Sequence, residues 1–109
     1  MTEQKQILST DPKQAIKDMI TITEELVARI EIETSAVATN DGTTFTMNES
    51  NKEHVADVYE KAAAEFRARV PEFRKVDKTL IAKLEEAQKS LGQSTKNNLK
   101  LLEKLQDKE

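Results

Sequence analysis

The sequence has no cysteine, no tryptophan, two glycines and two prolines among its 109 residues. The missing cysteine excludes disulfide bonds and thiolate zinc sites. Because glycine and proline are scarce, turn signals are few, and we expect a small number of long secondary-structure elements. Aromatic residues make up only 4% of the chain and hydrophobic residues 37%. This composition suits an elongated helical bundle better than an α/β fold.

Charges of both signs are plentiful and mixed along the chain. Charged residues make up 34% of the sequence, and the net charge is only −3. Because nucleic-acid binding and anionic membrane surfaces both require a basic patch, we expect neither as a partner. No run approaches the roughly 18 apolar residues of a membrane span, and the first ten residues lack the apolar stretch of a signal peptide. We therefore expect a soluble, cytoplasmic protein without membrane insertion.

Apolar residues recur every three or four positions through most of the second half of the chain. This spacing places them along one seam of a helix that packs against another helix. The seam consists of Val55, Tyr59, Ala62, Phe66, Phe73, Val76, Leu80, Leu84, Ala87, Leu91, Leu102 and Leu105. A shorter seam in the first half offers a partner surface and consists of Ile16, Ile20, Val27, Ile30 and Val37.

These seams predict three helices, at about residues 12–38, 51–70 and 72–106. Asp11 is the expected N-cap of the first helix, and Pro12 fits its first position. The fold class is therefore all-α, and we expect one domain over residues 1–109.

The polar segment 39–50 lacks the helical spacing, and we expect a loop there. It contains Asn40-Asp41-Gly42, a turn signal in which glycine takes a positive φ. Ser50 then opens a capping box for the second helix. Residues 1–9 and 107–109 show no pattern, and we expect both termini to be frayed.

Pro71 separates the second and third helices. A proline inside a helix loses a hydrogen bond and clashes with the preceding turn. The apolar seam keeps its phase from Phe66 to Phe73, and no glycine or asparagine nearby favours a reversal. We therefore expect a kink or a short break at residues 70–72. A kink gives an elongated antiparallel hairpin with an overhanging C-terminal helix, whereas a reversal gives an antiparallel bundle of three helices.

No pattern in the sequence indicates catalysis or metal binding. His54 is the only histidine, and metal sites in helical bundles need Glu-x-x-His pairs on more than one helix. The carboxylates, including Glu33, often stand three or four residues from a lysine or arginine, and we expect them on solvated helix faces. Phosphate-binding glycine loops and nucleophile motifs are absent. We expect no enzyme, no cofactor and no metal.

Three short patterns carry a family resemblance. The first is Glu24-Glu25-Leu26-Val27 followed by Arg29-Ile30-Glu31-Ile32-Glu33, an apolar repeat leading into glutamates. The second is Asn51-Lys52-Glu53 followed by Ala56 and Val58-Tyr59-Glu60, and the third is Lys96-Asn97-Asn98-Leu99-Lys100-Leu101-Leu102. Together, over residues 16–105, they resemble the FlgN family of flagellar type III export chaperones, in particular its divergent alphaproteobacterial members. The polar segment 39–50 differs from the helix-rich linker of that family.

This resemblance implies a small cytoplasmic chaperone without ATPase activity. Such a protein holds the C-terminal amphipathic helix of a hook–filament junction protein, prevents premature assembly and delivers its client to the export apparatus. The implied client-binding residues lie on the last helix and are Leu91, Leu99, Leu101, Leu102 and Leu105. The same leucines would also serve to pack against the first helix or against a second copy in a homodimer.

Three other functions remain open from the sequence. One is a structural coiled coil whose dimer is the functional unit. A second is a secreted helical hairpin of the WXG type, although the chain lacks a Trp-x-Gly turn and a suitable C-terminal signal. A third is a small antitoxin or phage regulator, against which the absence of a basic or DNA-reading helix argues.

Overall fold

A computed structural model describes residues 6–107, except for the side chain of Asp107. This part of the chain is helical and contains no strand, which confirms the predicted all-α fold. The helices are α1 (Pro12–Ala38), α2 (Gly42–Ala68), α3 (Val70–Phe73) and α4 (Lys78–Asp107). The sequence predicts three helices, and the additional one is the four-residue α3. None of the helices in this range is long and apolar enough to cross a membrane.

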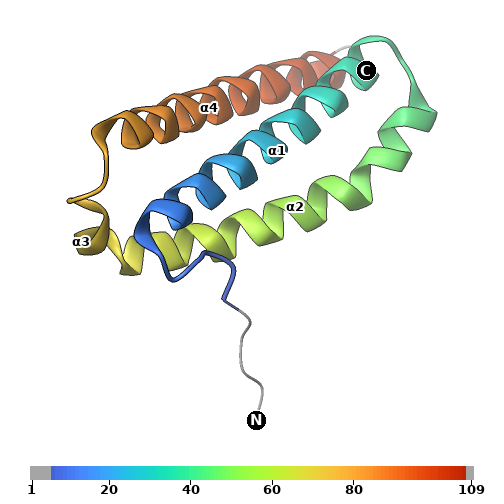
Figure 1. Cartoon of the computed structure of the whole chain (residues 1–109). Coiled ribbons are helices and arrows are strands. Elements are labelled where there is room, and N and C mark those ends of the chain that lie inside the picture. Colours follow the sequence, from blue (N-terminus) through green and yellow to red (C-terminus); the bar gives the residue numbers. More distant parts are fainter. Residues whose placement is uncertain (1–5, 108–109) are drawn as a thin grey trace.

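Helix α1 lies between α2 and α4 and packs against both (Figure 1). Helix α2 runs antiparallel to α1, and α4 runs back parallel to α1. The molecule is elongated and thin, with extents of 51 × 37 × 19 Å and a radius of gyration of 16.3 Å. A compact domain of this length has a radius of gyration of about 13 Å. The helices therefore form a shallow layer rather than a closed bundle.

Helix α1 has the same bounds as the sequence predicts. The carboxylate of Asp11 accepts a hydrogen bond from the backbone amide of Gln14, and Pro12 fits the first turn, where an amide proton has no helical partner. The buried face differs from the predicted seam, because Ile16 is the only member of that seam that is buried. The buried residues of α1 are Ala15, Ile16, Met19, Thr23, Leu26, Glu33 and Ala36.

A short turn at residues 39–41 joins α1 to α2, so the predicted loop at 39–50 is wrong. Asn40, not Gly42, takes the positive φ, at 57°. The amide of Asp41 donates to the carbonyl of Ala36 over 2.7 Å, and the amide of Asn40 donates to the carbonyl of Val37. These two bonds form a Schellman cap, which needs one left-handed residue, and asparagine tolerates that conformation.

Helix α2 begins at Gly42, nine residues before the predicted start at 51. The carboxylate of Asp41 accepts hydrogen bonds from the hydroxyl and the backbone amide of Thr44, which lower the pKa of Asp41 below its ordinary value of 3.8. The predicted capping residue, Ser50, lies inside the helix. Asn48 is buried, and its amide group donates to the carbonyl of Arg29 over 2.9 Å. This contact with α1 holds the polar start of α2 in place.

The chain reverses direction between α2 and α4, so the predicted kink is wrong, and residues 70–72, the position of the predicted break, are helical within α3, with a non-helical link at residues 74–77. Pro71 lies in the first turn of α3, where its missing amide proton costs little. Phe73, at the end of α3, is buried and stacks on Phe66, with ring centroids 4.4 Å apart. The guanidinium of Arg69 lies 5.4 Å from the centroid of the Phe73 ring. The two phenylalanines thus hold the reversal together.

Helix α4 begins at Lys78 rather than at the predicted residue 72. The carboxylate of Asp77 accepts a hydrogen bond of 2.8 Å from the backbone amide of Thr79. That bond lowers the pKa of Asp77 below 3.8. Asp77 therefore caps α4 as Asp41 caps α2.

Residues 6–9 are ordered, contrary to the predicted fraying, and Leu8 is buried in the core. The backbone amides of Ile7 and Leu8 donate to the carboxylate of Glu65. The guanidinium of Arg69 donates to the carbonyls of Ser9 and Thr10. At the other end α4 extends through residue 107. Residues 1–5 and 108–109, also predicted to be frayed, lie outside the described residues.

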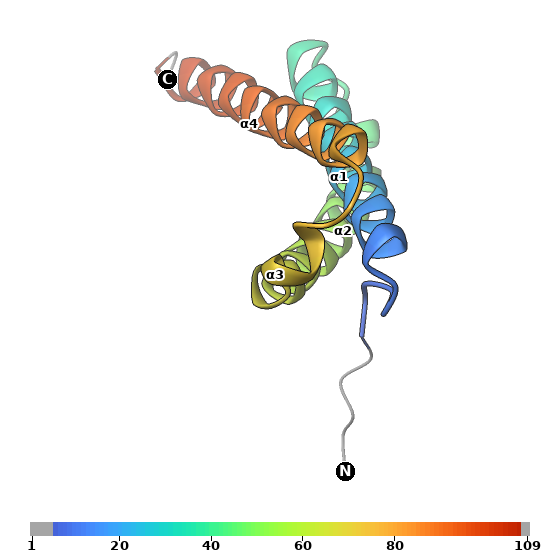
Figure 2. The ribbon, with the colours of Figure 1, turned by 60° about the vertical axis from the view of Figure 1, so that its left-hand side comes forward.

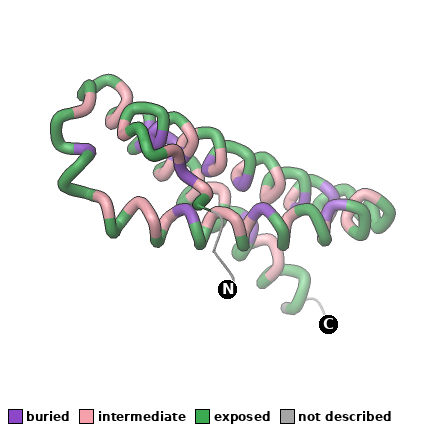
Figure 3. Tube along the Cα trace, turned by 60° about the horizontal axis from the view of Figure 1, so that its bottom comes forward, coloured by how far each residue is buried: buried purple, intermediate pink, exposed green. Residues whose placement is uncertain are grey.

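The apolar core lies at the end of the molecule that carries α3, which we call the α3 end. The opposite end, with the turn at residues 39–41, is the turn end. Figure 3 shows that buried positions are a small part of the trace. The buried cluster at the α3 end consists of Leu8, Ala15, Ile16, Met19, Ala62, Phe73 and Leu84.

Candidate partner-binding groove

Helices α2 and α4 form the walls of an open groove whose floor is α1. In Figure 2 the C-terminal end of α4 points away from the turn that joins α1 and α2. The groove has a volume of about 320 Å³, and we call it the α2/α4 groove. Its floor is lined by Leu26, Ile30 and Glu33, and its walls by Lys52, Ala56, Tyr59, Glu60, Leu91, Thr95, Asn98 and Leu99.

The α4 wall exposes apolar surface to solvent. Leu99 is 54% exposed and lines the groove about two helical turns after the half-buried Leu91. Leu26 and Ile30 supply an apolar floor between the two walls. Fully burying a leucine side chain stabilises a complex by roughly 1.5–3 kcal/mol. The groove is therefore suited to an apolar side chain from another helix.

Of the five leucines predicted to bind a client, two lie in this groove. Leu91 and Leu99 line it, as described above. Leu101 and Leu102 are half-buried, Leu105 is 44% exposed, and none of these three lines the groove. They lie on the last turns of α4.

A polar cluster lies at the base of the groove, formed by the buried Glu33 and Asn98 and the half-buried Thr34 and Lys52. Glu33 is 4% exposed, so its predicted place on a solvated face is wrong. One carboxylate oxygen is paired with the ammonium group of Lys52, and the other accepts a hydrogen bond of 2.9 Å from the amide of Asn98. Asn98 also donates to the hydroxyl of Thr34 over 3.0 Å. A buried carboxylate needs such partners, because desolvation disfavours its charge.

The spacing of the sequence contains a signal for this cluster. Glu33 stands seven residues after Leu26 and three after Ile30, so it occupies a core position of α1. Asn98 likewise stands seven residues after Leu91 on α4. A polar residue in phase with an apolar seam indicates a buried polar group, which is how these two residues could have been recognised.

A second polar contact closes the groove toward the α3 end. The hydroxyl of Tyr59 donates to Oε1 of Gln88 over 2.8 Å, which joins α2 to α4. The amide of Gln88 donates to the hydroxyl of Thr23 over 3.1 Å, and that hydroxyl donates to the carbonyl of Met19. This chain of bonds crosses all three long helices. It separates the groove from the apolar core.

The described side chains contain no group of three or more histidine, cysteine, aspartate or glutamate residues placed to hold a metal ion. His54 is exposed on α2.

The chain exposes more surface than a compact monomer of its size. Its accessible surface is 7806 Å², whereas about 6,100 Å² is typical of a monomeric protein of 12.3 kDa. The thin, open arrangement of the helices contributes to this difference. Comparisons of the chain with models of protein families, with curated proteins and with solved structures find no match.

Proposed function

We propose that this chain is a non-enzymatic chaperone that holds an amphipathic helix of another protein in the α2/α4 groove. The observation that carries the proposal is the exposure of Leu99 on the wall of a groove whose floor presents Leu26 and Ile30 beside Glu33. An added helix would lie over α1 between α2 and α4 and complete the bundle. Recognition of this kind uses apolar anchors at i, i+3 or i+4, and i+7 of the bound helix.

The resemblance to FlgN-like chaperones directs the choice of the first client. On that basis the client is the C-terminal helix of a hook–filament junction protein, held in the cytoplasm before transfer to the export apparatus. Covering the apolar face of such a helix prevents its premature assembly. The alternative is a structural coiled coil whose dimer covers the α4 leucines and leaves no free groove.

The test is titration calorimetry with peptides from the C-terminal helices of hook–filament junction proteins, at fixed salt. We expect a one-to-one complex with the full-length chain. Leu99→Glu should weaken binding by roughly 10- to 100-fold, because it replaces an apolar anchor by a charge. Since Leu99 is exposed, the far-ultraviolet circular dichroism of the variant should be unchanged.

Val70→Glu is the matched control. Val70 is 41% exposed on α3, outside the α2/α4 groove, so this variant should bind the peptide as the original chain does. Equal affinity for Leu99→Glu and the original chain would refute the groove. A tight dimer that ignores every peptide would favour the structural coiled coil.

A further inference from the structure

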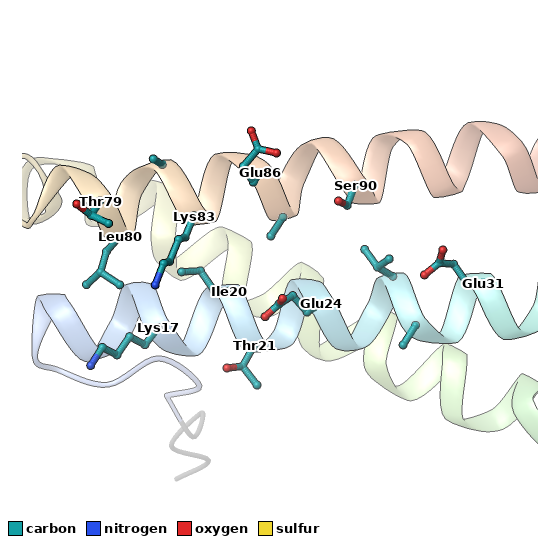
Figure 4. Close-up of a pocket in the computed structure, with 14 residues that line it drawn as sticks. Lys17, Ile20, Thr21, Glu24, Glu31, Thr79, Leu80, Lys83, Glu86 and Ser90 are labelled. Atoms are coloured by element: carbon teal, nitrogen blue, oxygen red, sulfur yellow. The ribbon is translucent and has the colours of Figure 1, made fainter.

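A second groove lies between α1 and α4, and the proposed client site does not use it. Its volume is about 900 Å³, and Figure 4 shows the side chains along it. We call it the α1/α4 groove. It shares no lining residue with the α2/α4 groove. On α1 it uses positions such as Ile20 and Val27, whereas the other groove uses Leu26 and Ile30, so the two grooves lie on different sides of that helix.

The charges along this groove are ordered. Lys17 and Lys83 lie toward the α3 end, and Glu24 and Glu86 follow toward the turn end (Figure 4). On α1 Lys17 is followed by Glu24 and then Glu31, and on α4 Lys83 is followed by Glu86, so lysine comes before glutamate on both walls. Because α1 and α4 are parallel, the groove has a basic end followed by an acidic stretch.

Contacts between α1 and α4 fix which residues lie level with each other. Gln88 bonds to Thr23, and Asn98 bonds to Glu33, and in both pairs the residues are 65 positions apart in the sequence. A residue of α4 is thus level with the α1 residue 65 positions before it. With this offset of 65 residues, the point between Leu84 and Glu85 on α4 lies at the same height along the helix axes as the point between Met19 and Ile20 on α1.

We propose that a second copy of the chain docks on the α1/α4 groove in antiparallel orientation, around a two-fold axis near Ile20. On α1, the point halfway between Lys17 and Glu24 lies between Ile20 and Thr21. An axis there places Lys17 opposite the partner's Glu24, and the partner's Lys17 opposite Glu24.

The same axis also pairs the charges of α4. The point halfway between Lys83 and Glu86 lies between Leu84 and Glu85, which is within about one residue, or 1.5 Å along the helix, of the axis found from α1. Lys83 then faces the partner's Glu86. The Lys17–Glu24 pair of α1 and the Lys83–Glu86 pair of α4 thus share nearly the same two-fold axis, as a self-complementary interface requires, and Glu31 lies beyond these pairs toward the turn end.

The apolar residues of the groove favour the same occupant. Ile20, Val27 and Leu80 are only half-buried in the single chain. Face-to-face packing of two α1–α4 layers would place them in the core of a four-helix arrangement. A charge pattern with two-fold symmetry fits a second copy better than a client helix, because the charges of an unrelated helix need not follow that symmetry. The α2/α4 groove stays open in this dimer.

The test uses charge reversal on the full chain, with sedimentation velocity over a concentration series. We expect a reversible dimer of twice 12.3 kDa. Lys17→Glu with Lys83→Glu places glutamates opposite glutamates at four positions, and Glu24→Lys with Glu86→Lys places lysines opposite lysines. Each double variant should dimerise at least about tenfold more weakly, because several weak surface pairs change from attraction to repulsion. An equimolar mixture of the two variants should dimerise again, since all four pairs are complementary.

Lys61→Glu with Asp57→Lys is the control, because it exchanges the members of an exposed ion pair on α2, outside the groove. It should dimerise as the original chain does. A chain that stays monomeric up to millimolar concentration would overturn the proposal, as would a dimer insensitive to both double variants or a mixture without recovery. Loss of client binding in Lys17→Glu with Lys83→Glu, without any dimer, would assign the groove to the client instead. The dimer proposal does not depend on the client site, so it would stand even if Leu99→Glu left peptide binding unchanged.

Discussion

Glu33 shows how one residue can act on both packing and recognition. It is a buried carboxylate whose two oxygens bind Lys52 from α2 and Asn98 from α4. It thereby links α1 to both walls of the α2/α4 groove. Burying charges costs desolvation energy, so such a cluster fixes how helices align more reliably than it adds stability.

We predict that Glu33→Leu lowers the free energy of unfolding by about 3 kcal/mol. Removing one member of a buried pair typically costs 3–5 kcal/mol, and the low end applies because the side chain of Lys52 is still 24% exposed. Urea denaturation followed by circular dichroism measures the change.

The matched variant replaces Glu33, Lys52 and Asn98 together by leucine. We expect its stability to return to that of the original chain or above it, because an apolar replacement needs no compensating charge. A triple variant as unstable as Glu33→Leu alone would show that the cluster itself is net stabilising.

At the scale of elements, the turn between α1 and α2 depends on Asn40. Its positive φ costs energy for any residue with a Cβ atom, whereas glycine adopts that conformation freely. Gly42, in contrast, has an ordinary helical φ, and a Cβ atom there would meet no atom within 4 Å. The flexibility of glycine is therefore not used at residue 42.

We predict that Gly42→Ala stabilises the fold by up to about 1 kcal/mol, because alanine favours the helix and restricts the unfolded chain. Asn40→Ala should destabilise it by about 1 kcal/mol, because alanine disfavours the left-handed conformation. Thermal unfolding of the two variants measures both changes. If Gly42→Ala were the destabilising substitution and Asn40→Ala the neutral one, the positive φ would belong to Gly42, as the sequence suggests.

At the scale of the whole molecule, the two ends are stabilised differently. The buried apolar cluster lies at the α3 end, where Phe66, Phe73 and the segment around Leu8 close the structure. The turn end depends on polar contacts across the groove, such as those of Glu33 and Asn98. Local opening requires less free energy where fewer apolar contacts are buried.

We therefore expect amide hydrogen exchange to be graded along the long axis. Amides near Ile16, Ala62 and Leu84 should exchange slowest, and those at residues 42–50 and 99–107 fastest. Exchange measured by mass spectrometry on overlapping peptides tests the gradient. Equal protection at both ends would contradict it, and a client peptide should raise protection mainly around Leu99.

Local sequence rules account for much of this protein. The three- and four-residue spacing determines that the chain is helical, and the Asp11-Pro12 cap sets the start of α1. Local sequence rules also place a break near Pro71, because proline cannot donate the hydrogen bond that would continue α2. For the candidate site, the sequence places Leu91 and Leu99 on one helix without showing what faces them.

Tertiary contacts decided the rest, since they join residues far apart in the chain. The polar start of α2 packs on α1 through the hydrogen bond from Asn48 to the carbonyl of Arg29. The chain reverses after α2 because Phe73 finds its place against Phe66 in the core, although the same spacing also fits one continuous helix. Glu33 is buried because Lys52 and Asn98 meet it from two other helices. Periodicity indicates the inward face of each helix. Whether a charged residue on that face is buried, and in which direction the chain turns between helices, depends on the side chains that neighbouring helices place against that face.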